Sequence, residues 1–319
     1  MTSREPPAHP RCTRLAPSPT GALHPGNART FLVNWALARR AGWRIVMRIE
    51  DLDSPRVRPG RIAETLDTLA WLGLDWDGGV MIQSADLAPY RAAMDCLARA
   101  GKVYPSDLSR KDLEAVSAPQ EGSHEVRFDA SLRPAYLPGS FDDRTGVPWR
   151  FVVEPGAGVV LDAFAGACGV DVEQSVGDFV VWTRAGVPAY QLAVVVDDAR
   201  QGVTDIVRGN DLLESAARQM LLIEALGLGE PPRYFHLPLV RGPDGRRLAK
   251  RHGDSRLSTY RDAGTPPERI VGLCAHWCGI LGRPEPMSAA DFADGLDLST
   301  MSRDDVVFTP EDDRWLREG

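Results

Sequence analysis

The alternation of helical and extended patterns in the first hundred residues constrains the fold of this chain most strongly. Apolar side chains recur at helical spacing over 28–41 and again over 60–72, and they alternate along 43–49 as in a strand. A short extended segment, 14–16, precedes the first helical pattern, which Asn27 can cap. The order β-α-β-α predicts the first half of a parallel, doubly wound sheet.

The pattern changes beyond residue 101 and returns near residue 189. Three short extended stretches, broken by Pro and Gly, are expected at 136–140, 146–148 and 154–158. After them, strands are expected at 190–196, 204–207 and 234–240, and a helix over 211–226. We therefore expect four parts: a first half of the α/β domain, an inserted subdomain, the second half and a helical C-terminal region, over 1–101, 102–188, 189–256 and 257–319.

The segment 16–27 (APSPTGALHPGN) lies between the first expected strand and the first expected helix. A helix amino end offers unpaired backbone N–H groups and a positive dipole to a phosphate. Gly21 and Gly26 permit close approach of the backbone, and Thr20 and His24 can hydrogen-bond phosphate oxygens. A capped loop with an incidental histidine is the alternative interpretation.

Acidic residues and one arginine follow the other expected strands of the sheet. Segment 48–53 (RIEDLD) ends one strand, 190–198 (YQLAVVVDD) is expected as a buried central strand, and Arg208 ends its neighbour. Open α/β sheets bind ligands at these carboxyl ends, where a carboxylate can hold an ammonium group and an arginine can grip a carboxylate. The alternatives are a solvated acidic loop and an internal salt bridge of Arg208 with Asp197, Asp198 or Asp211.

A glycine-rich turn at 242–245 precedes the basic segment 247–251 (RLAKR). Its Lys250 is one of only three lysines among 37 basic residues. A mobile loop that places a lysine on a triphosphate stabilises charge in phosphoryl or adenylyl transfer. A solvated basic loop is the alternative.

These segments, in this order and spacing, resemble the class I aminoacyl-tRNA synthetases of the glutamyl type. His24 to Asn27 (HPGN) resembles the HIGH signature, and 248–251 (LAKR) lies where KMSKS would fall. More specific are 14–21 (RLAPSPTG), 48–53 and 207–211 (VRGND), and the resemblance spans residues 12–260. Asn27 replaces the second histidine of HIGH, and Ala249 and Arg251 replace the serines of KMSKS. His24 and Lys250 would then carry more of the phosphate contact.

Chain length points to one branch of that family. Glutamyl-tRNA synthetases carry large helical anticodon-binding domains after KMSKS, whereas this sequence ends at Gly319. It therefore resembles the truncated glutamyl-Q tRNA(Asp) synthetases, which attach glutamate to the queuosine base of tRNA(Asp), and 190–198 and 236–239 (HLPL) fit that branch. Two alternatives remain: a compact synthetase that charges a tRNA 3′ end, and a non-catalytic glutamate or nucleotide sensor.

The resemblance implies a Rossmann-type parallel sheet with an inserted α+β subdomain, a short helical C-terminal region and no anticodon-binding domain. It implies a ligase that activates L-glutamate with ATP, without tRNA, to glutamyl-adenylate and transfers the glutamate to queuosine at the wobble position of tRNA(Asp). Glu50 would hold the substrate ammonium, Tyr190 would close the pocket, and Arg208 would pair with the side-chain carboxylate.

The implied site residues fall into three groups. The catalytic ones are His24 and Lys250. Those that bind glutamate are Arg14, Leu15, Ala16, Pro17, Ser18, Glu50, Tyr190 and Arg208. Those that bind ATP, together with Mg²⁺, are Thr20, His24, Gly26, Asn27 and Lys250. Zinc is not expected near Tyr104, because 104–108 (YPSDL) lacks the Cys-x-Cys pair of many relatives.

Composition sets further limits on the class of protein. No apolar run of about 18 residues and no signal segment occur, so no membrane contact and a cytoplasmic location are expected. The net charge of −7 excludes a surface that is basic all round, so tRNA binding would need a local patch of arginines.

Five scattered cysteines indicate reduced thiols. Cys274 and Cys278 lie on an apolar helical pattern that favours packing over metal binding. We expect a monomer.

Overall fold

A parallel sheet in two parts forms the centre of the protein. The computed structural model describes residues 10–53, 57–108, 127–143, 146–156, 158–246, 248 and 255–318. In the first part, β2 (Arg44–Ile49) pairs in parallel with β1 (Cys12–Leu15) and with β3 (Val80–Ile82). The second part has the order β7-β6-β10-β9, in which β6 (Gly158–Asp162), β10 (Arg233–Leu237) and β9 (Asp205–Gly209) are parallel and β7 (Gly166–Val170) closes an antiparallel hairpin.

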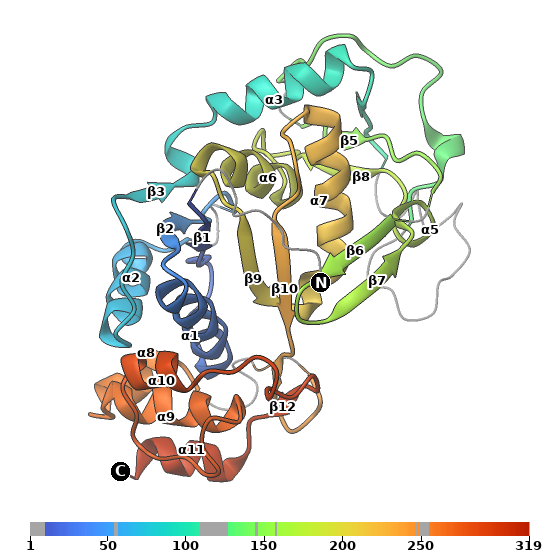
Figure 1. Cartoon of the computed structure of the whole chain (residues 1–319). Coiled ribbons are helices and arrows are strands. Elements are labelled where there is room, and N and C mark those ends of the chain that lie inside the picture. Colours follow the sequence, from blue (N-terminus) through green and yellow to red (C-terminus); the bar gives the residue numbers. More distant parts are fainter. Residues whose placement is uncertain are drawn as a thin grey trace.

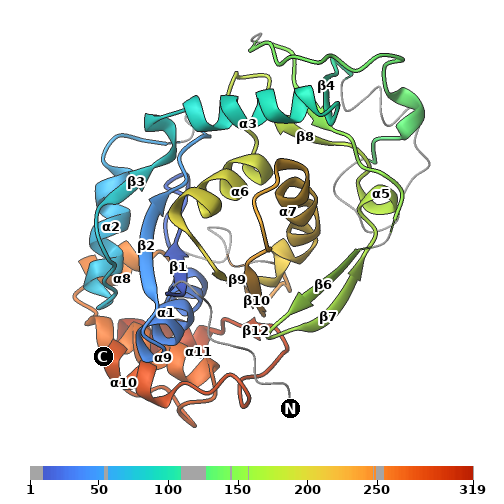
Figure 2. The same ribbon diagram turned by 45° about the horizontal axis from the view of Figure 1, so that its top comes forward.

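The two parts meet at β1 and β9, which lie side by side (Figures 1 and 2). At their amino ends the backbone N–H of Thr204 donates to the Cys12 carbonyl at 2.8 Å, and the Cys12 N–H donates to the Thr204 hydroxyl at 2.9 Å. The chain leaves these strands in opposite directions across the sheet, β1 toward β2 and β9 toward β10. Their carboxyl ends therefore form the switch point at which open α/β sheets place their ligands.

Helix α1 (Pro25–Arg40) covers this junction and begins three residues earlier than the sequence pattern suggests. His24, not Asn27, is the N-cap: its Nδ1 accepts the Asn27 backbone N–H at 3.4 Å, and the Asn27 side chain accepts the His24 N–H at 3.0 Å. The prediction of Asn27 as the cap was wrong because Pro25 and Gly26 belong to the helix, where proline fits the first turn.

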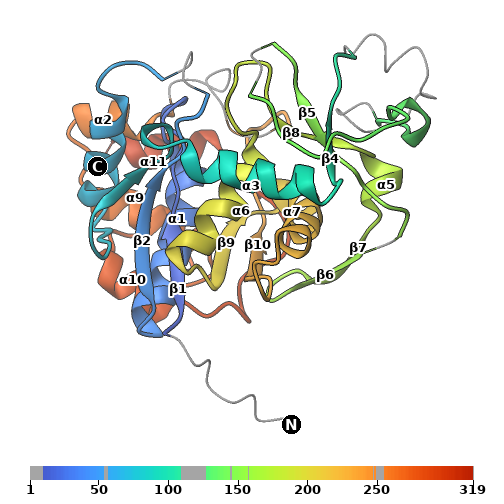
Figure 3. The same ribbon diagram turned by 90° about the horizontal axis from the view of Figure 1, so that it is seen from above.

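Helix α6 (Tyr190–Gln201) corrects the prediction of a central strand at 190–196. Every residue from Gln191 to Asp198 is buried, because α6 packs against α7 (Leu213–Leu226), α3 (Ala88–Arg99) and β8 (Phe179–Trp182), as Figure 3 shows for the helices. A short helix buried on all sides has the same continuous apolar run as a buried strand, so periodicity does not separate them.

The inserted region holds different strands from those predicted. An antiparallel sheet joins β4 (Val103–Pro105), β5 (Trp149–Phe151) and β8. The short helix α5 (Val172–Ser175) lies between β7 and β8 along the chain. No strand covers 136–140 or 146–148, and the strand expected at 154–158 begins at Gly158 as β6, which pairs with the main sheet. The sequence pattern of the turns in these stretches resembles that of short strands.

Three 3₁₀ turns complete the described connections: Gln83–Ala85, Ala130–Leu132 and Asn210–Leu212.

In the C-terminal region, two helices, α9 (Pro267–Trp277) and α10 (Ala289–Gly295), pack against α1 (Figure 1). The region also contains α8 (Leu257–Asp262) and α11 (Pro310–Arg317), while α2 (Arg61–Trp71) lies beside the first sheet. The short β11 (Val240–Arg241) pairs with β12 (Val306–Val307), which ties this region to the end of β10.

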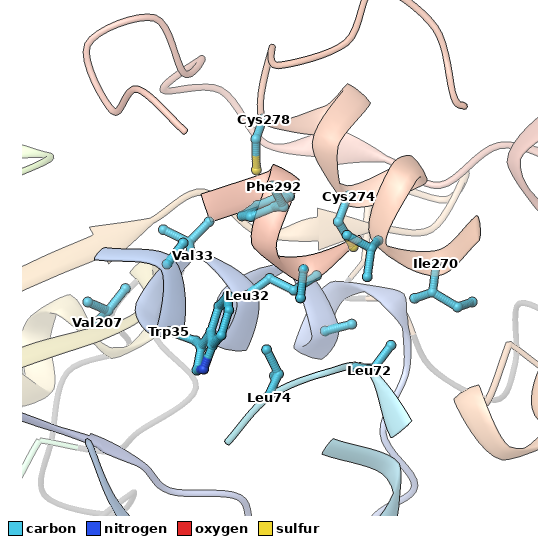
Figure 4. Packing of buried hydrophobic residues seen from close by; sticks show 14 of the residues in the cluster. Leu32, Val33, Trp35, Leu72, Leu74, Val207, Ile270, Cys274, Cys278 and Phe292 are labelled. Atoms are coloured by element: carbon cyan, nitrogen blue, oxygen red, sulfur yellow. The ribbon is translucent and has the colours of Figure 1, made fainter. Parts of the chain in front are cut away.

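Cys274 and Cys278 are fully buried in the core between α9, α10 and α1, beside Leu32 and Phe292 (Figure 4), so they pack as the apolar pattern predicts. All five cysteines are free thiols. Within the described ranges, no group of three or more His, Cys, Asp or Glu side chains could hold a metal ion. In the same ranges no helix has the length and apolarity needed to cross a membrane.

Candidate functional site

A cavity of about 650 Å³ opens at the carboxyl ends of β1, β2 and β9, beside the amino ends of α1 and α6. Eleven of the thirteen predicted site residues line it: Arg14, Ala16, Pro17, Ser18, Thr20, His24, Gly26, Asn27, Glu50, Tyr190 and Arg208. Leu15 does not, because alternation along β1 turns its side chain away from that of Arg14 and into the core with α1. Lys250 lies outside the described residues.

A buried ion-pair cluster lies behind one wall of the cavity and reaches the cavity surface through Glu50. The guanidinium of Arg48, fully buried on β2, donates to Asp198 Oδ1 at 2.7 Å and to Glu50 Oε1 at 3.1 Å. Although burial opposes its charge, these two carboxylates raise the pKa of Arg48 above its ordinary value. Burial raises the pKa of Glu50, against the opposing effect of Arg48 and Arg14. The cluster therefore fixes the Glu50 carboxylate at the cavity wall.

Arg14 stands next to this cluster with hydrogen-bonding capacity left over. Its Nε lies 3.6 Å from Asp198 Oδ1 and makes no hydrogen bond within the described residues, while its Nη1 donates to the Val207 carbonyl at 3.4 Å. Burial, together with the nearby charges of Arg48 and Arg208, lowers the pKa of Arg14. A buried cation that repels its neighbours and keeps an unused donor favours an anionic ligand in the cavity.

Arg208 lines the cavity from the end of β9, and its hydrogen-bond partners are not the aspartates of the alternative interpretation. Its Nε donates to His236 Nε2 at 2.9 Å, and its Nη2 donates to the Leu212 carbonyl at 3.2 Å. Its guanidinium carbon lies 5.2 Å from the centre of the Tyr234 ring. The internal salt bridge considered as the alternative is absent from its described contacts, so its positive charge remains available to the cavity.

The other half of the cavity is built from backbone and small side chains around the start of α1. A Cβ at Gly26 would lie 3.0 Å from both His24 Cε1 and Val240 Cβ, so a larger residue there would have to push these side chains away by a few tenths of an ångström. His24 Nδ1 accepts the Asn27 N–H, which places the ring proton of the neutral imidazole on Nε2. Ser18 Oγ and Thr20 Oγ1 lie 3.1 Å apart. Helix N–H groups and hydroxyls in this arrangement are suited to phosphate oxygens.

Several lining residues were missed by the sequence analysis. They come from α1, the end of β9, the segment after β10 and the start of α8: Thr30, Phe31, Val207, Gly209, Asp211, Leu239, Val240, Leu248, Ser255 and Arg256. Arg256 is the notable member, because it adds a cation beside the phosphate-binding half. Its position five residues after the basic segment 247–251 was the signal that could have found it.

Comparisons with known proteins agree with this geometry. A sequence model of the family described as tRNA synthetases class I (E and Q), catalytic domain, matches residues 12–281. The Glutamyl-Q tRNA(Asp) synthetase of Rhodopirellula baltica is 44% identical over 84% of each chain, and that of Symbiobacterium thermophilum is 43% identical over 94% of this chain and 96% of its own. Glutamate–tRNA ligase 2 of Halorhodospira halophila is 37% identical, and this chain covers 65% of it.

A solved structure supports the same fold. The glutamate tRNA ligase of Elizabethkingia meningosepticum, in complex with its amino acid, superposes with a TM-score of 0.79 at 25% identity over 97% of this chain and 69% of the ligase. These matches confirm the predicted fold class and the family resemblance.

Proposed function

Because this chain belongs to the class I glutamyl- and glutaminyl-tRNA synthetase family and is a ligase, we propose that it activates L-glutamate with ATP in the absence of tRNA and transfers it to queuosine in tRNA(Asp). In the first step an oxygen of the glutamate α-carboxylate attacks the α-phosphate of ATP. A new O–P bond forms, pyrophosphate leaves, and glutamyl-adenylate results. The substrate supplies the nucleophile, so the protein has to align the reactants and stabilise charge.

The amino-acid half of the cavity supports the glutamate assignment. Glu50, held by Arg48, offers a fixed carboxylate to the substrate ammonium, and Arg14 and Ser18 lie within the same wall. Tyr190, at the start of α6 and 38% exposed, is placed to close the pocket over the bound amino acid. We propose that Arg208 binds the side-chain carboxylate of the substrate.

The single observation that carries this proposal is the buried guanidinium of Arg208, which forms no ion pair within the part of the chain that the structure describes. A neutral amide cannot satisfy a desolvated guanidinium as a carboxylate does, and the difference is worth roughly 2–3 kcal/mol. Glutamine is therefore excluded by the same side chain that binds glutamate.

The other half of the cavity is proposed to bind ATP, which brings Mg²⁺ with it as part of the substrate. The amino end of α1 with Gly26 and Asn27, the His24 Nε2–H and the Thr20 hydroxyl would contact the phosphates, and Lys250 would join them as developing charge is stabilised. We propose no zinc near Tyr104, whose hydroxyl donates to Asp178 Oδ2 at 2.6 Å.

The choice of acceptor is supported by sequence identity. Two relatives named Glutamyl-Q tRNA(Asp) synthetase are 43–44% identical to this chain and a third is 37% identical, against 35–39% for the relatives named glutamate–tRNA ligase. We also propose that the enzyme works as a cytoplasmic monomer. We propose that its four parts end at residues 101, 188, 256 and 319, as expected from the sequence.

The test of the acceptor uses radiolabelled glutamate and ATP with tRNA from queuosine-containing cells and from cells lacking queuosine. Label confined to the first pool, and also found on a queuosine-bearing anticodon stem-loop without a 3′ acceptor end, is the expected result. Equal labelling of both pools would instead identify a compact enzyme that charges a tRNA 3′ end. Labelling of neither pool would reject both acceptors.

A further inference from the structure

A buried chain of hydrogen bonds runs from the hairpin β6–β7 to Arg208. His236, on β10 and 1% exposed, lies between them: its Nδ1 is 2.7 Å from Asp162 Oδ2, and its Nε2 is 2.9 Å from Arg208 Nε. The Tyr234 ring stacks on the imidazole with the ring centres 5.7 Å apart. None of these groups except Arg208 lines the cavity.

Asp162 is the fixed end of this chain. Its Oδ1 accepts the backbone N–H of Phe164 at 2.8 Å and of Ala165 at 2.6 Å, and its Oδ2 accepts the His236 backbone N–H at 3.0 Å. Although burial opposes ionisation, these donors and the His236 ring hold the pKa of Asp162 below its ordinary value. Because several donors hold this ionised carboxylate in place, its position fixes the orientation of the His236 imidazole.

These hydrogen bonds allow only one protonation state of His236. Arg208 Nε–H can only donate, so His236 Nε2 must carry a lone pair and Nδ1 must carry the proton that it donates to Asp162. Burial, together with the charge of Arg208, lowers the pKa of His236, which keeps the ring neutral. Arg208 is therefore oriented by a neutral acceptor.

We propose that His236, oriented by Asp162, is a positioning residue for Arg208 and thereby sets the selectivity for glutamate over glutamine. This inference rests on the proposed role of Arg208 as the ligand of the side-chain carboxylate. A carboxylate at position 236 would fix the guanidinium equally well, but it would neutralise it and compete with the substrate. The neutral imidazole and the Leu212 carbonyl fix the guanidinium and leave its charge to the substrate.

Two matched variants separate the two contacts of the imidazole. In His236→Gln the amide oxygen reaches the place of Nε2 and can accept from Arg208, whereas in His236→Asn the amide lies near Nδ1 and can reach only Asp162. We expect His236→Asn to raise the KM for glutamate about 10- to 30-fold in pyrophosphate exchange, because a lost hydrogen bond to a charged group has that effect. Its kcat and its KM for ATP should stay within about two-fold, and His236→Gln should restore most of the glutamate KM and of the discrimination against glutamine.

The outcomes distinguish this inference from its premise. If the wild-type enzyme shows no glutamate-dependent exchange, the proposed function fails and the inference fails with it. If the wild type is active and His236→Asn keeps its glutamate KM and its discrimination, only the positioning role is overturned. If both variants lose thermal stability and ATP affinity to the same extent, His236 is a packing residue and the positioning role is likewise overturned.

Discussion

Two buried arginines, Arg48 and Arg208, differ in the charge of the groups that surround them. Arg48 is bound by two carboxylates, those of Asp198 and Glu50, and does not line the cavity. Arg208 lines the cavity, and every hydrogen bond it makes within the described residues goes to a neutral group. Sequence alone does not separate these residues, because each stands at or near the carboxyl end of a strand.

The difference teaches which arginine is structural and which is available to a ligand. A guanidinium neutralised by carboxylates inside the protein stabilises the wall that holds it, and removing it leaves buried anions uncompensated. A guanidinium fixed by neutral acceptors has a positive charge that remains available to an anionic ligand. The account therefore predicts a loss of stability at the first arginine and a loss of substrate binding at the second.

Replacing Arg48 should have the largest effect, and the effect should be on stability. Arg48→Met keeps the apolar bulk but leaves Asp198 and Glu50 buried without their cation, so we expect the free energy of unfolding to fall by about 3–5 kcal/mol. Urea denaturation followed by circular dichroism measures it. A change below about 1 kcal/mol would contradict the structural assignment of Arg48.

Replacing Arg208 should affect glutamate activation rather than stability. We expect Arg208→Ala to reduce kcat/KM for glutamate in pyrophosphate exchange by about 100- to 1,000-fold, because a buried charged partner of the substrate is removed. Selection of glutamate over glutamine should be lost. Arg208→Lys, which keeps the charge but not the fork, is the matched control and should recover only part of the activity. Near-normal glutamate activation by Arg208→Ala would overturn the assignment.

Glu50 sharpens the comparison because it belongs to the Arg48 cluster and also lines the cavity. Glu50→Gln should raise the KM for glutamate about 30-fold, through the loss of a charged partner for the substrate ammonium. The KM for ATP measured at saturating glutamate should not change. A rise in both constants by the same factor would mean that the variant disturbs the whole cavity.

The pH dependence of Glu50 has a definite sign. Since burial raises its pKa, the folded protein binds the Glu50 proton more readily than the unfolded chain does. The stability that protonated Glu50 contributes is fully present below the pKa that Glu50 has in the unfolded chain. It is lost as the pH rises through the pKa that Glu50 has in the folded protein. Substrate binding needs the ionised form, so the KM for glutamate should rise as the pH falls toward the raised pKa. This rise should be weaker in Glu50→Gln, and an unchanged pH profile would contradict the role of Glu50.

The smallest effect is expected in the phosphate-binding half, which uses backbone instead of buried charge. Gly26→Ala places a Cβ against His24 and Val240, and we expect the KM for ATP to rise about 10-fold, as for an overpacked site. Gly79→Ala is the control, since its Cβ meets nothing within 4 Å and the residue does not line the cavity. The temperature of thermal unfolding should be lowered in the first variant and unchanged in the second. Equal behaviour of the two variants would remove the argument for a steric requirement at Gly26.

The sequence analysis located the cavity because its motifs are local. Segments such as 14–21 and 48–53 contain both the strand end and the residues that follow it, so a correct order of elements brings them together. It assigned α6 to the wrong class because a helix buried on all sides resembles a buried strand.

The partners of the arginines could not be read from the sequence. Arg48 and Asp198 are 150 residues apart, and Asp162 and His236 are 74 apart, so each pair is created only by the packing of distant elements. Segment 236–239 was noticed as a motif, but nothing local in it connects His236 to Arg208. Physical contact across the sheet decides these roles.

The most direct test of the account is ATP–pyrophosphate exchange by the purified enzyme with glutamate or glutamine and without any RNA. The account predicts exchange that depends on glutamate, with glutamine at least about 30-fold poorer in kcat/KM because it leaves the Arg208 guanidinium unsatisfied. Exchange that requires tRNA, or that proceeds equally well with glutamine, would contradict the central claim that the charge of Arg208 is reserved for the substrate carboxylate.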